Sequence, residues 1–289
     1  MLRTRVIVGS LLAALVFGML LFDTQFAPWY PLLYILVIWT GILACRELLS
    51  LLALKVRPHA IVALAGVVFA LSCPWFPQVA YRESRIADWA ILVLVVSMMI
   101  AFFREMAIYQ GPGQAVVRIA MTCFIVVYLG IMPCFLIALR WLPGPEESGN
   151  RAMSALILAI FVPKCGDIGA YFTGRLLGRH RMTPYLSPKK TWEGAAGAFA
   201  SAIVIAVIGA SMGNRPPAWV PKAVLFGIVI GLLGMLGDLA ESLIKRENFQ
   251  KDASDAVPGF GGILDVIDSV VFSAPVSYLL ISNDWVSPL

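Results

Sequence analysis

Long apolar runs recur along the whole chain and are separated by short polar stretches. A run of about 20 apolar residues is long enough to cross the ~30 Å hydrocarbon core of a bilayer as an α-helix. Such runs predict helices over residues 6–22, 30–53, 60–76, 87–103, 115–139, 152–178, 194–212, 223–243 and 263–281. We therefore predict an all-α integral membrane protein, a polytopic bundle of about nine transmembrane helices in a single membrane domain over residues 1–289.

The composition also indicates a bilayer as the solvent. Of the 289 residues, 60% are apolar and 13% are charged, and the mean hydropathy is +0.86. Soluble domains are about a quarter charged and about half apolar. The five cysteines stand singly with no CxxC pair, so neither a disulfide framework nor a thiolate metal site is indicated.

The distribution of positive charge predicts the orientation, because Lys and Arg accumulate in cytoplasmic loops. With nine helices, 14 of these side chains fall on the side of the N-terminus and six on the opposite side. We expect a cytoplasmic N-terminus. The first apolar run begins with Arg3 and Arg5 but lacks a small-x-small cleavage site, so we expect an uncleaved anchor. The net charge of +5 follows from this topology and requires no nucleic-acid partner.

Chemically distinctive residues concentrate after residue 160. We therefore interpret residues 1–150 as a helical scaffold and lipid-facing half, and residues 151–289 as the half that carries the chemistry. In the first half, residues 46–47 and 104–105 are adjacent Arg-Glu pairs near predicted helix ends. We interpret both as snorkelling side chains that pair with each other.

The stretch KCGDIGAYFTGRLLGRHR begins at Lys164. Gly174 and Gly178 form a GxxxG pattern, which lets another helix approach closely. Lys164 and Asp167 lie three residues apart on one helical face. Because a carboxylate inside a membrane span costs several kcal/mol and usually marks a site, Asp167 is a candidate binding residue. A simple Lys164–Asp167 ion pair is the alternative.

The stretch SPKKTWEGAAG begins at Ser187. Ser187 and Pro188 favour a turn, and either Thr191 or Ser187 can cap the helix that follows. Lys189 and Lys190 would then stand at a helix N-terminus, which favours anions. The pattern predicts a phosphate site, and a plain topology signal is the alternative.

The stretch GLLGMLGDLAESLIKR ends at Arg246. Asp238, Glu241 and Lys245 are spaced i, i+3 and i+7, so two carboxylates and an ammonium group share one helical face. We interpret Asp238, beside a glycine-lined interface, as a buried ligand. A plain surface pair between Glu241 and Lys245 is the alternative.

The stretch PGFGGILDVID joins a turn to the last apolar run. Gly261 and Gly262 leave little side-chain bulk to keep a ligand off the backbone. Asp265 and Asp268 follow at i and i+3 on the next helix. Together with Asp238 they offer three oxygen ligands, which suits Mg²⁺, a hard cation that binds phosphates.

Other chemistries fit the sequence poorly. The two histidines, His59 and His180, are far apart, which disfavours a His-rich zinc or haem site. The chain has no GxxxxGK[ST] loop and no GxGxxG motif after a strand, so a P-loop or Rossmann nucleotide site is not indicated. A serine-hydrolase elbow is also missing.

Taken in order, DIGAY, SPKKTWEG, GDLAES, SLIKR-x4-KD and PGFGGILDVID make the chain resemble the phosphatidate cytidylyltransferase, or CDP-diacylglycerol synthase, family over residues 164–269. The resemblance implies a helical membrane enzyme of phospholipid biosynthesis that condenses CTP with phosphatidic acid, giving CDP-diacylglycerol and pyrophosphate. It implies a requirement for Mg²⁺ and allows a second bound cation. It further implies that the protein forms a homodimer. It also implies a multi-pass protein of the bacterial cytoplasmic membrane whose active site faces the cytoplasm.

The expected roles combine this resemblance with the patterns above. The expected catalytic residues are Asp238, Asp265, Asp268 and Lys190, and the three aspartates are also the expected metal ligands. The expected substrate-binding residues are Asp167, Ser187, Lys189, Thr191, Glu193, Glu241, Lys245, Arg246, Lys251, Asp252, Gly261 and Gly262. The two lysines of SPKK are expected to hold the triphosphate, and the cations after residue 244 the pyrophosphate or the lipid head group.

Two residues depart from the family pattern. Phe260 stands where the family usually has histidine, and Val266 where it usually has arginine. Because the carboxylates and the basic residues remain, we expect an active, divergent enzyme. The alternatives are a CTP-dependent enzyme that acts on another lipid phosphate or prenol, and an ion-coupled transporter, since intramembrane carboxylates also mark transport sites.

Overall fold

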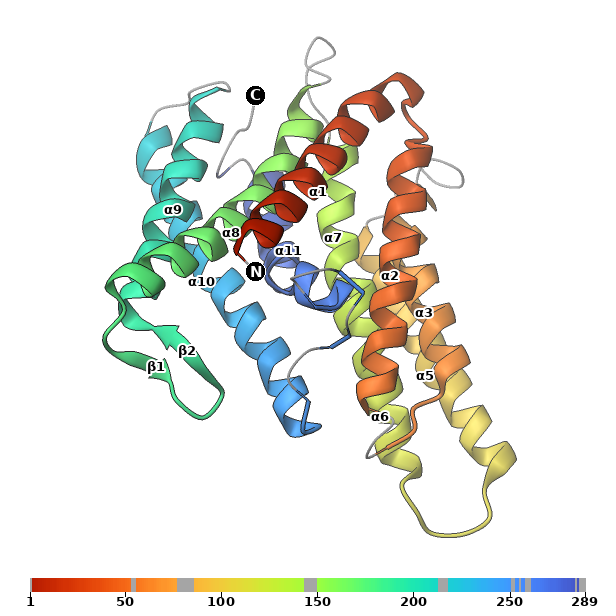
Figure 1. The fold of residues 1–289 in the computed structure, drawn as a ribbon. Coiled ribbons are helices and arrows are strands. Elements are labelled where there is room, and N and C mark those ends of the chain that lie inside the picture. The colour runs from red at the N-terminus through yellow and green to blue at the C-terminus, as the bar shows by residue number, and fades with distance from the viewer. Residues whose placement is uncertain are drawn as a thin grey trace. The chain divides into compact units, whose positions relative to one another are not determined.

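The computed structural model describes residues 2–52, 56–76, 86–142, 150–212, 218–250, 253–254, 256–257, 261–283 and 285, and almost all of this chain is helical (Figure 1). The α-helices are α1 (Leu2–Asp23), α2 (Pro31–Leu52), α3 (Ala60–Ser72), α5 (Ile86–Ile108), α6 (Ala115–Ile125), α7 (Met132–Ala138), α8 (Asn150–Leu177), α9 (Trp192–Ser211), α10 (Trp219–Glu247) and α11 (Ile263–Ser282). A π-helical stretch, Val126–Ile131, joins α6 to α7.

Eight helical segments of the described chain are long and apolar enough to cross a membrane. One of them, Ala115–Trp141, runs continuously through α6, the π-helical stretch and α7. The run predicted over 60–76 forms a shorter apolar helix, Ala60–Trp75. The prediction of an all-α, polytopic membrane protein is confirmed. The side of the membrane on which the N-terminus lies stays a prediction.

The chain divides into two compact units. The first contains Met1–Cys134 and Glu247–Val266, and the second contains Phe135–Arg246 and Ile267–Leu289. The PGFGGILD segment therefore belongs to the N-terminal unit, although it lies late in the sequence.

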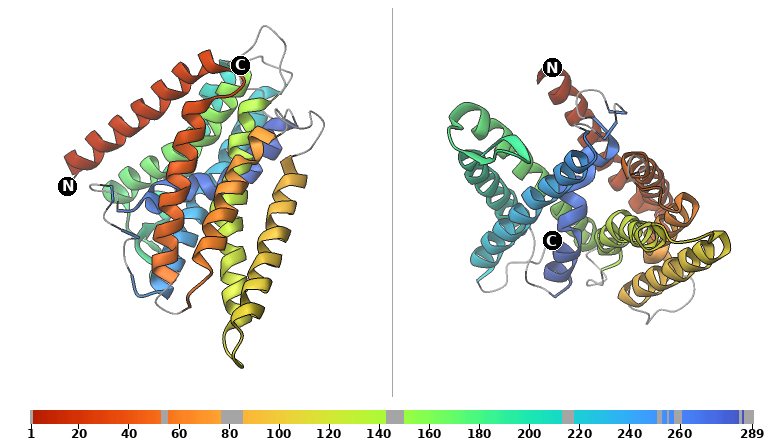
Figure 2. Two further views of the ribbon diagram at one scale, coloured as in Figure 1. Left: turned by 90° about the vertical axis from the view of Figure 1, so that its right-hand side faces the viewer. Right: turned by 90° about the horizontal axis from the view of Figure 1, so that it is seen from below.

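In the first unit, α2, α3, α5 and α6 run side by side (Figure 2). The buried carboxylate of Glu105 in this unit has its partners on other elements of the chain. The Glu105 carboxylate on α5 accepts two hydrogen bonds from the Arg118 guanidinium on α6, at 2.5 and 2.7 Å, and lies 2.8 Å from His59 Nε2. The interpretation of Glu105 as the partner of its neighbour Arg104 did not anticipate these contacts, because they join residues far apart in sequence.

In the second unit, α8 and α9 pack side by side and are joined by a small antiparallel hairpin (Figure 1). The hairpin consists of β1 (Arg181–Thr183) and β2 (Ser187–Thr191), with Arg181 paired to Thr191 and Thr183 paired to Ser187. Only a turn was predicted here, so the two strands are an addition to the expected fold. The predicted cap is confirmed, because Thr191 Oγ1 accepts a hydrogen bond from Gly194 N at 3.1 Å.

Small residues allow the helices of this unit to approach closely. A Cβ atom at Gly237 on α10 would lie 2.6 Å from the Asp268 carbonyl oxygen and 2.7 Å from Phe272 Cβ on α11. A Cβ atom at Gly178 would similarly lie 2.8 Å from Thr191 Oγ1. Glycine at position 237 therefore lets α11 pack against α10, which brings Asp268 beside the acidic face of α10.

Candidate active site

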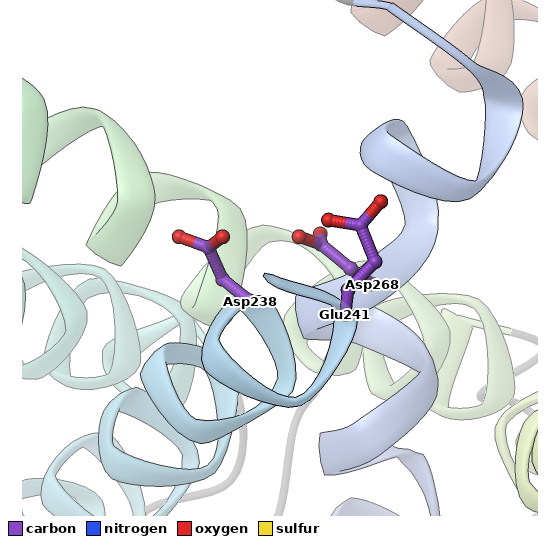
Figure 3. A group of neighbouring side chains, drawn as sticks. All are labelled: Asp238, Glu241 and Asp268. Atoms are coloured by element: carbon purple, nitrogen blue, oxygen red, sulfur yellow. The ribbon is translucent and has the colours of Figure 1, made fainter. Parts of the chain in front are cut away.

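Three carboxylates meet where α10 and α11 pack together. Asp238 and Glu241 project from α10 and Asp268 projects from α11, and all three face the same side of α10 (Figure 3). One carboxylate oxygen from each lies within 4.8 Å of the others, and Glu241 and Asp268 are buried. The i, i+3 spacing on α10 places Asp238 and Glu241 on one face, as predicted. The close contact of α11 with Gly237 brings the third acid, Asp268, to the same face.

Lysine side chains lie against the two acids of α10. Lys190 Nζ lies 2.8 Å from Asp238 Oδ2, and it also donates a hydrogen bond to the Met235 carbonyl oxygen at 3.4 Å. Lys245 Nζ donates to Glu241 Oε2 at 2.7 Å, and this pair is buried. The alternative of an exposed Glu241–Lys245 pair is therefore wrong. Lys190 reaches α10 because β2 ends directly before the capped start of α9.

Lys164 links two helices instead of pairing with Asp167 alone. Its Nζ lies 3.2 Å from Asp167 Oδ2 on α8 and 3.2 Å from Asp268 Oδ1 on α11. Ser269 Oγ donates a further hydrogen bond to Asp167 Oδ2 at 2.8 Å. The interpretation as a simple local ion pair is incomplete. Sequence reasoning missed the role of Lys164 because Asp268 lies 104 residues away.

The described part of this cluster contains four carboxylates, from Asp167 and the three acids of Figure 3, and three ammonium groups. Like charges this close repel one another strongly away from water, and interleaved opposite charges offset the repulsion. Such a site offers oxygen donors to a cation and ammonium donors to phosphates at the same place. It can therefore bind an anion together with its counter-cation.

The remaining predicted residues of this unit lie around the hairpin. Lys189 is exposed, and Arg246 Nε donates to the Leu186 carbonyl oxygen at 3.5 Å. The Glu193 carboxylate accepts hydrogen bonds from the backbone N–H groups of Arg179 and His180, at 3.1 and 3.2 Å, and lies 2.6 Å from His180 Nδ1. These contacts hold the end of α8 to the start of α9, and the predicted substrate-binding role of Glu193 stays a prediction.

Asp265, Gly261 and Gly262 belong to the first unit. Asp265 Oδ2 accepts hydrogen bonds from Gly262 N at 2.7 Å and from Ala253 N at 3.2 Å. The predicted metal set contained Asp265, whereas the clustered acids among the described residues include Glu241, which was predicted to bind substrate. The metal-ligand role of Asp265 stays a prediction.

Some predicted residues lie outside the described chain. They are Lys251 and Asp252, together with Phe260, one of the two departures from the family pattern. The other departure, Val266, lies half-buried on the first turns of α11. Its apolar side chain supplies no charge to this motif.

The fold and the site define a multi-pass membrane protein with a paired acid and lysine cluster on its helices. The model of the cytidylyltransferase family matches residues 3–283, and the chain therefore belongs to this family.

Curated relatives give a narrower comparison. The chain is 40% identical over 135 residues to the phosphatidate cytidylyltransferase of Synechocystis sp., a match that covers 47% of this chain and 45% of the relative. It is 37% identical over 144 residues to that of Brucella suis, covering 50% and 51%, and 31% identical over 172 residues to that of Mycobacterium tuberculosis, covering 60% and 50%. The chain thus spans about half the length of the curated relatives it matches.

Proposed function

We propose that this protein is a phosphatidate cytidylyltransferase that condenses CTP with phosphatidic acid. The single observation that carries the proposal is the cluster in which Asp238, Glu241 and Asp268 alternate with lysine ammonium groups. Membership of the cytidylyltransferase family and the names of the relatives support the choice of substrates. The proposal includes a cytoplasmic N-terminus and an active site that faces the cytoplasm of a bacterium.

The reaction requires positioning more than proton transfer. The phosphate of phosphatidic acid is already an anion at neutral pH, so one of its oxygens can attack the α-phosphorus of CTP without a strong base. The new bond joins that oxygen to the α-phosphorus, and the bond from the α-phosphorus to the bridging oxygen breaks, so that pyrophosphate leaves. The protein's task is to align two polyanions and to neutralise their charge.

The positions of the basic residues support this proposal. Lys190 stands at the capped start of α9, where helix geometry also favours anions, and together with Lys189 it holds the triphosphate. Lys245 and Arg246, in the last turn of α10, hold the leaving pyrophosphate or the head group of the lipid. The exposed apolar faces of the spanning helices accommodate the acyl chains.

The acidic residues fit Mg²⁺, because three carboxylate oxygens within 4.8 Å of one another are the hard donors that this cation prefers. Asp238, Glu241 and Asp268 would hold it, and Asp265 is a further candidate from the first turn of α11. When bound, Mg²⁺ neutralises charge on the phosphates. A second cation and a homodimer remain part of the proposal through the family resemblance.

The proposal is tested by incubating the purified protein in detergent micelles with labelled CTP, Mg²⁺ and either phosphatidate, another lipid phosphate or a prenol. The expected products with phosphatidate are CDP-diacylglycerol and pyrophosphate. Turnover only with another lipid would instead identify a related CTP-dependent enzyme.

A further inference from the structure

Glu47, near the end of α2, makes contacts that its sequence neighbourhood does not suggest. Its side chain is buried, and its carboxylate accepts three hydrogen bonds within the first unit. Ser254 Oγ donates to Oε1 at 2.6 Å, Ile263 N donates to Oε1 at 3.0 Å, and Leu264 N donates to Oε2 at 2.9 Å. All three donors belong to the segment around the PGFGGILD motif, more than 200 residues away in sequence.

The start of α11 explains why this carboxylate is needed. The first N–H groups of a helix have no partner inside the helix, and an N-cap side chain usually accepts from them. The residue before α11 is Gly262, which has no side chain to offer. Asp265 reaches back to Gly262 N, as the acidic residue of a capping box does. Glu47 supplies the missing acceptor for Ile263 and Leu264 from another helix.

Gly262 is also required for the approach of Glu47. A Cβ atom at position 262 would lie 2.6 Å from Glu47 Oε2 and 2.9 Å from Glu47 Cδ. The anion-favouring position at the start of α11 is thus held by a carboxylate of the protein itself. The same two acids also fix the segment before the turn, because Ala253 N donates to Asp265 and Ser254 Oγ donates to Glu47.

We propose that Glu47 is a positioning residue for the cytidylyl transfer, which fixes the first turn of α11 and, through that turn, the carboxylate of Asp265. The inference rests on the proposed function for its kinetic consequence. Glu47 has no need to touch a substrate in this role, because it acts through the backbone of the motif.

The chain offers a matched control in Asp23. This residue is also buried, and its carboxylate accepts hydrogen bonds from Leu32 N at 3.1 Å and Leu33 N at 2.9 Å at the start of α2. Glu47→Gln and Asp23→Asn therefore each weaken one buried carboxylate cap in the same unit. Only the first of them lies at the motif.

The first readout is amide hydrogen exchange, measured by mass spectrometry on the full protein in micelles without substrate. Glu47→Gln should raise exchange at Ile263 and Leu264 about tenfold, while Asp23→Asn should raise it at Leu32 and Leu33 only. Gly262→Ala, which displaces Glu47, should reproduce the change at α11. Unchanged exchange at Ile263 and Leu264 in both Glu47→Gln and Gly262→Ala would overturn the proposal.

The second readout is kinetic and separates positioning from general stability. In Glu47→Gln, kcat should fall about tenfold or more with the KM for phosphatidate within about twofold, while Asp23→Asn keeps the wild-type kcat. The fold reduction of kcat in the Glu47→Gln/Gly262→Ala double variant should be smaller than the product of the two single fold reductions, because both substitutions act through one contact. An equal fall of kcat in Asp23→Asn would overturn the proposal. Because exchange is read without substrate, a wild-type protein that makes no CDP-diacylglycerol would contradict the proposed function and leave the exchange result intact.

Discussion

Lys164 is the side chain on which the charge balance of the site depends most directly. Its ammonium group lies between the carboxylate of Asp167 on α8 and the buried carboxylate of Asp268 on α11. Lys164 is half-buried, and its removal leaves the buried carboxylate of Asp268 without its ion-pair partner, which destabilises the folded protein. The aliphatic part of the side chain can be replaced by methionine without a large change in volume.

Lys164→Met should therefore lower both stability and turnover, with a loss of rate on the order of a hundredfold. Thermal unfolding in micelles and the CTP assay measure the two effects. Arg175→Met is the control, because Arg175 is an exposed cation on the same helix whose guanidinium contacts Tyr171. Wild-type turnover in Lys164→Met would contradict the role assigned to this lysine.

Glu241 was predicted to bind substrate, and it lies in the acidic cluster that we propose holds Mg²⁺. It is 1% exposed, and its carboxylate lies among the clustered oxygens. Glu241→Gln should lower the rate about a hundredfold and raise the Mg²⁺ concentration needed for half-maximal rate, because a neutral amide binds a divalent cation more weakly. Asp88→Asn, at an exposed acid in the first turn of α5, should change neither quantity. An unchanged Mg²⁺ dependence in Glu241→Gln would remove Glu241 from the proposed metal ligands.

The β1–β2 hairpin carries Lys190, the lysine of SPKK that contacts α10. It is short, and it is held by the Thr191 cap on one side and by the contacts of Glu193 with the end of α8 on the other. Helix α9 therefore begins at a fixed residue, which sets where Lys190 lies. The position of the lysine depends on the cap more than on the strands.

Thr191→Ala should cost about 1 kcal/mol of stability through loss of the cap and should raise the KM for CTP several-fold. Ser211→Ala is the matched control, because Ser211 lies at the opposite end of α9, where its hydroxyl bonds the Ile208 carbonyl oxygen. Thermal unfolding and initial rates at varied CTP measure both effects. An equal rise of KM in the two variants would show that the cap has no specific role in binding.

The helices could be predicted from sequence because a membrane span requires a long apolar run, and this requirement is local. The acidic face of α10 could also be predicted from a local signal, because helical spacing alone places Asp238 near Glu241. The hairpin was missed because its strands contain three and five residues and carry no alternating pattern. Lys164 and Glu47 were missed because their partners lie 104 and more than 200 residues away, and tertiary contacts of this kind leave no periodic signal.

At the scale of the whole molecule, we expect Mg²⁺ and CTP to bind to the site cooperatively. Each acid of the cluster has an ammonium partner, so a cation alone would displace lysines, and a triphosphate alone would meet carboxylates. We expect the rise of Tm with CTP and Mg²⁺ together to exceed the sum of the rises with each alone, because coupled ligands stabilise the folded protein jointly. Thermal unfolding in micelles measures this. A full rise with Mg²⁺ alone would contradict the coupling.

We propose above that the acid and lysine cluster transfers a cytidylyl group to phosphatidic acid. The most direct measurement follows labelled CTP into the lipid fraction, with pyrophosphate counted at the same time, for the wild-type protein and for Asp238→Asn in micelles with Mg²⁺. We expect equal amounts of CDP-diacylglycerol and pyrophosphate from the wild-type protein and about a hundredfold less from the variant. A folded wild-type protein that forms no labelled lipid, or an Asp238→Asn variant with the wild-type rate, would show that the cluster does not catalyse this transfer.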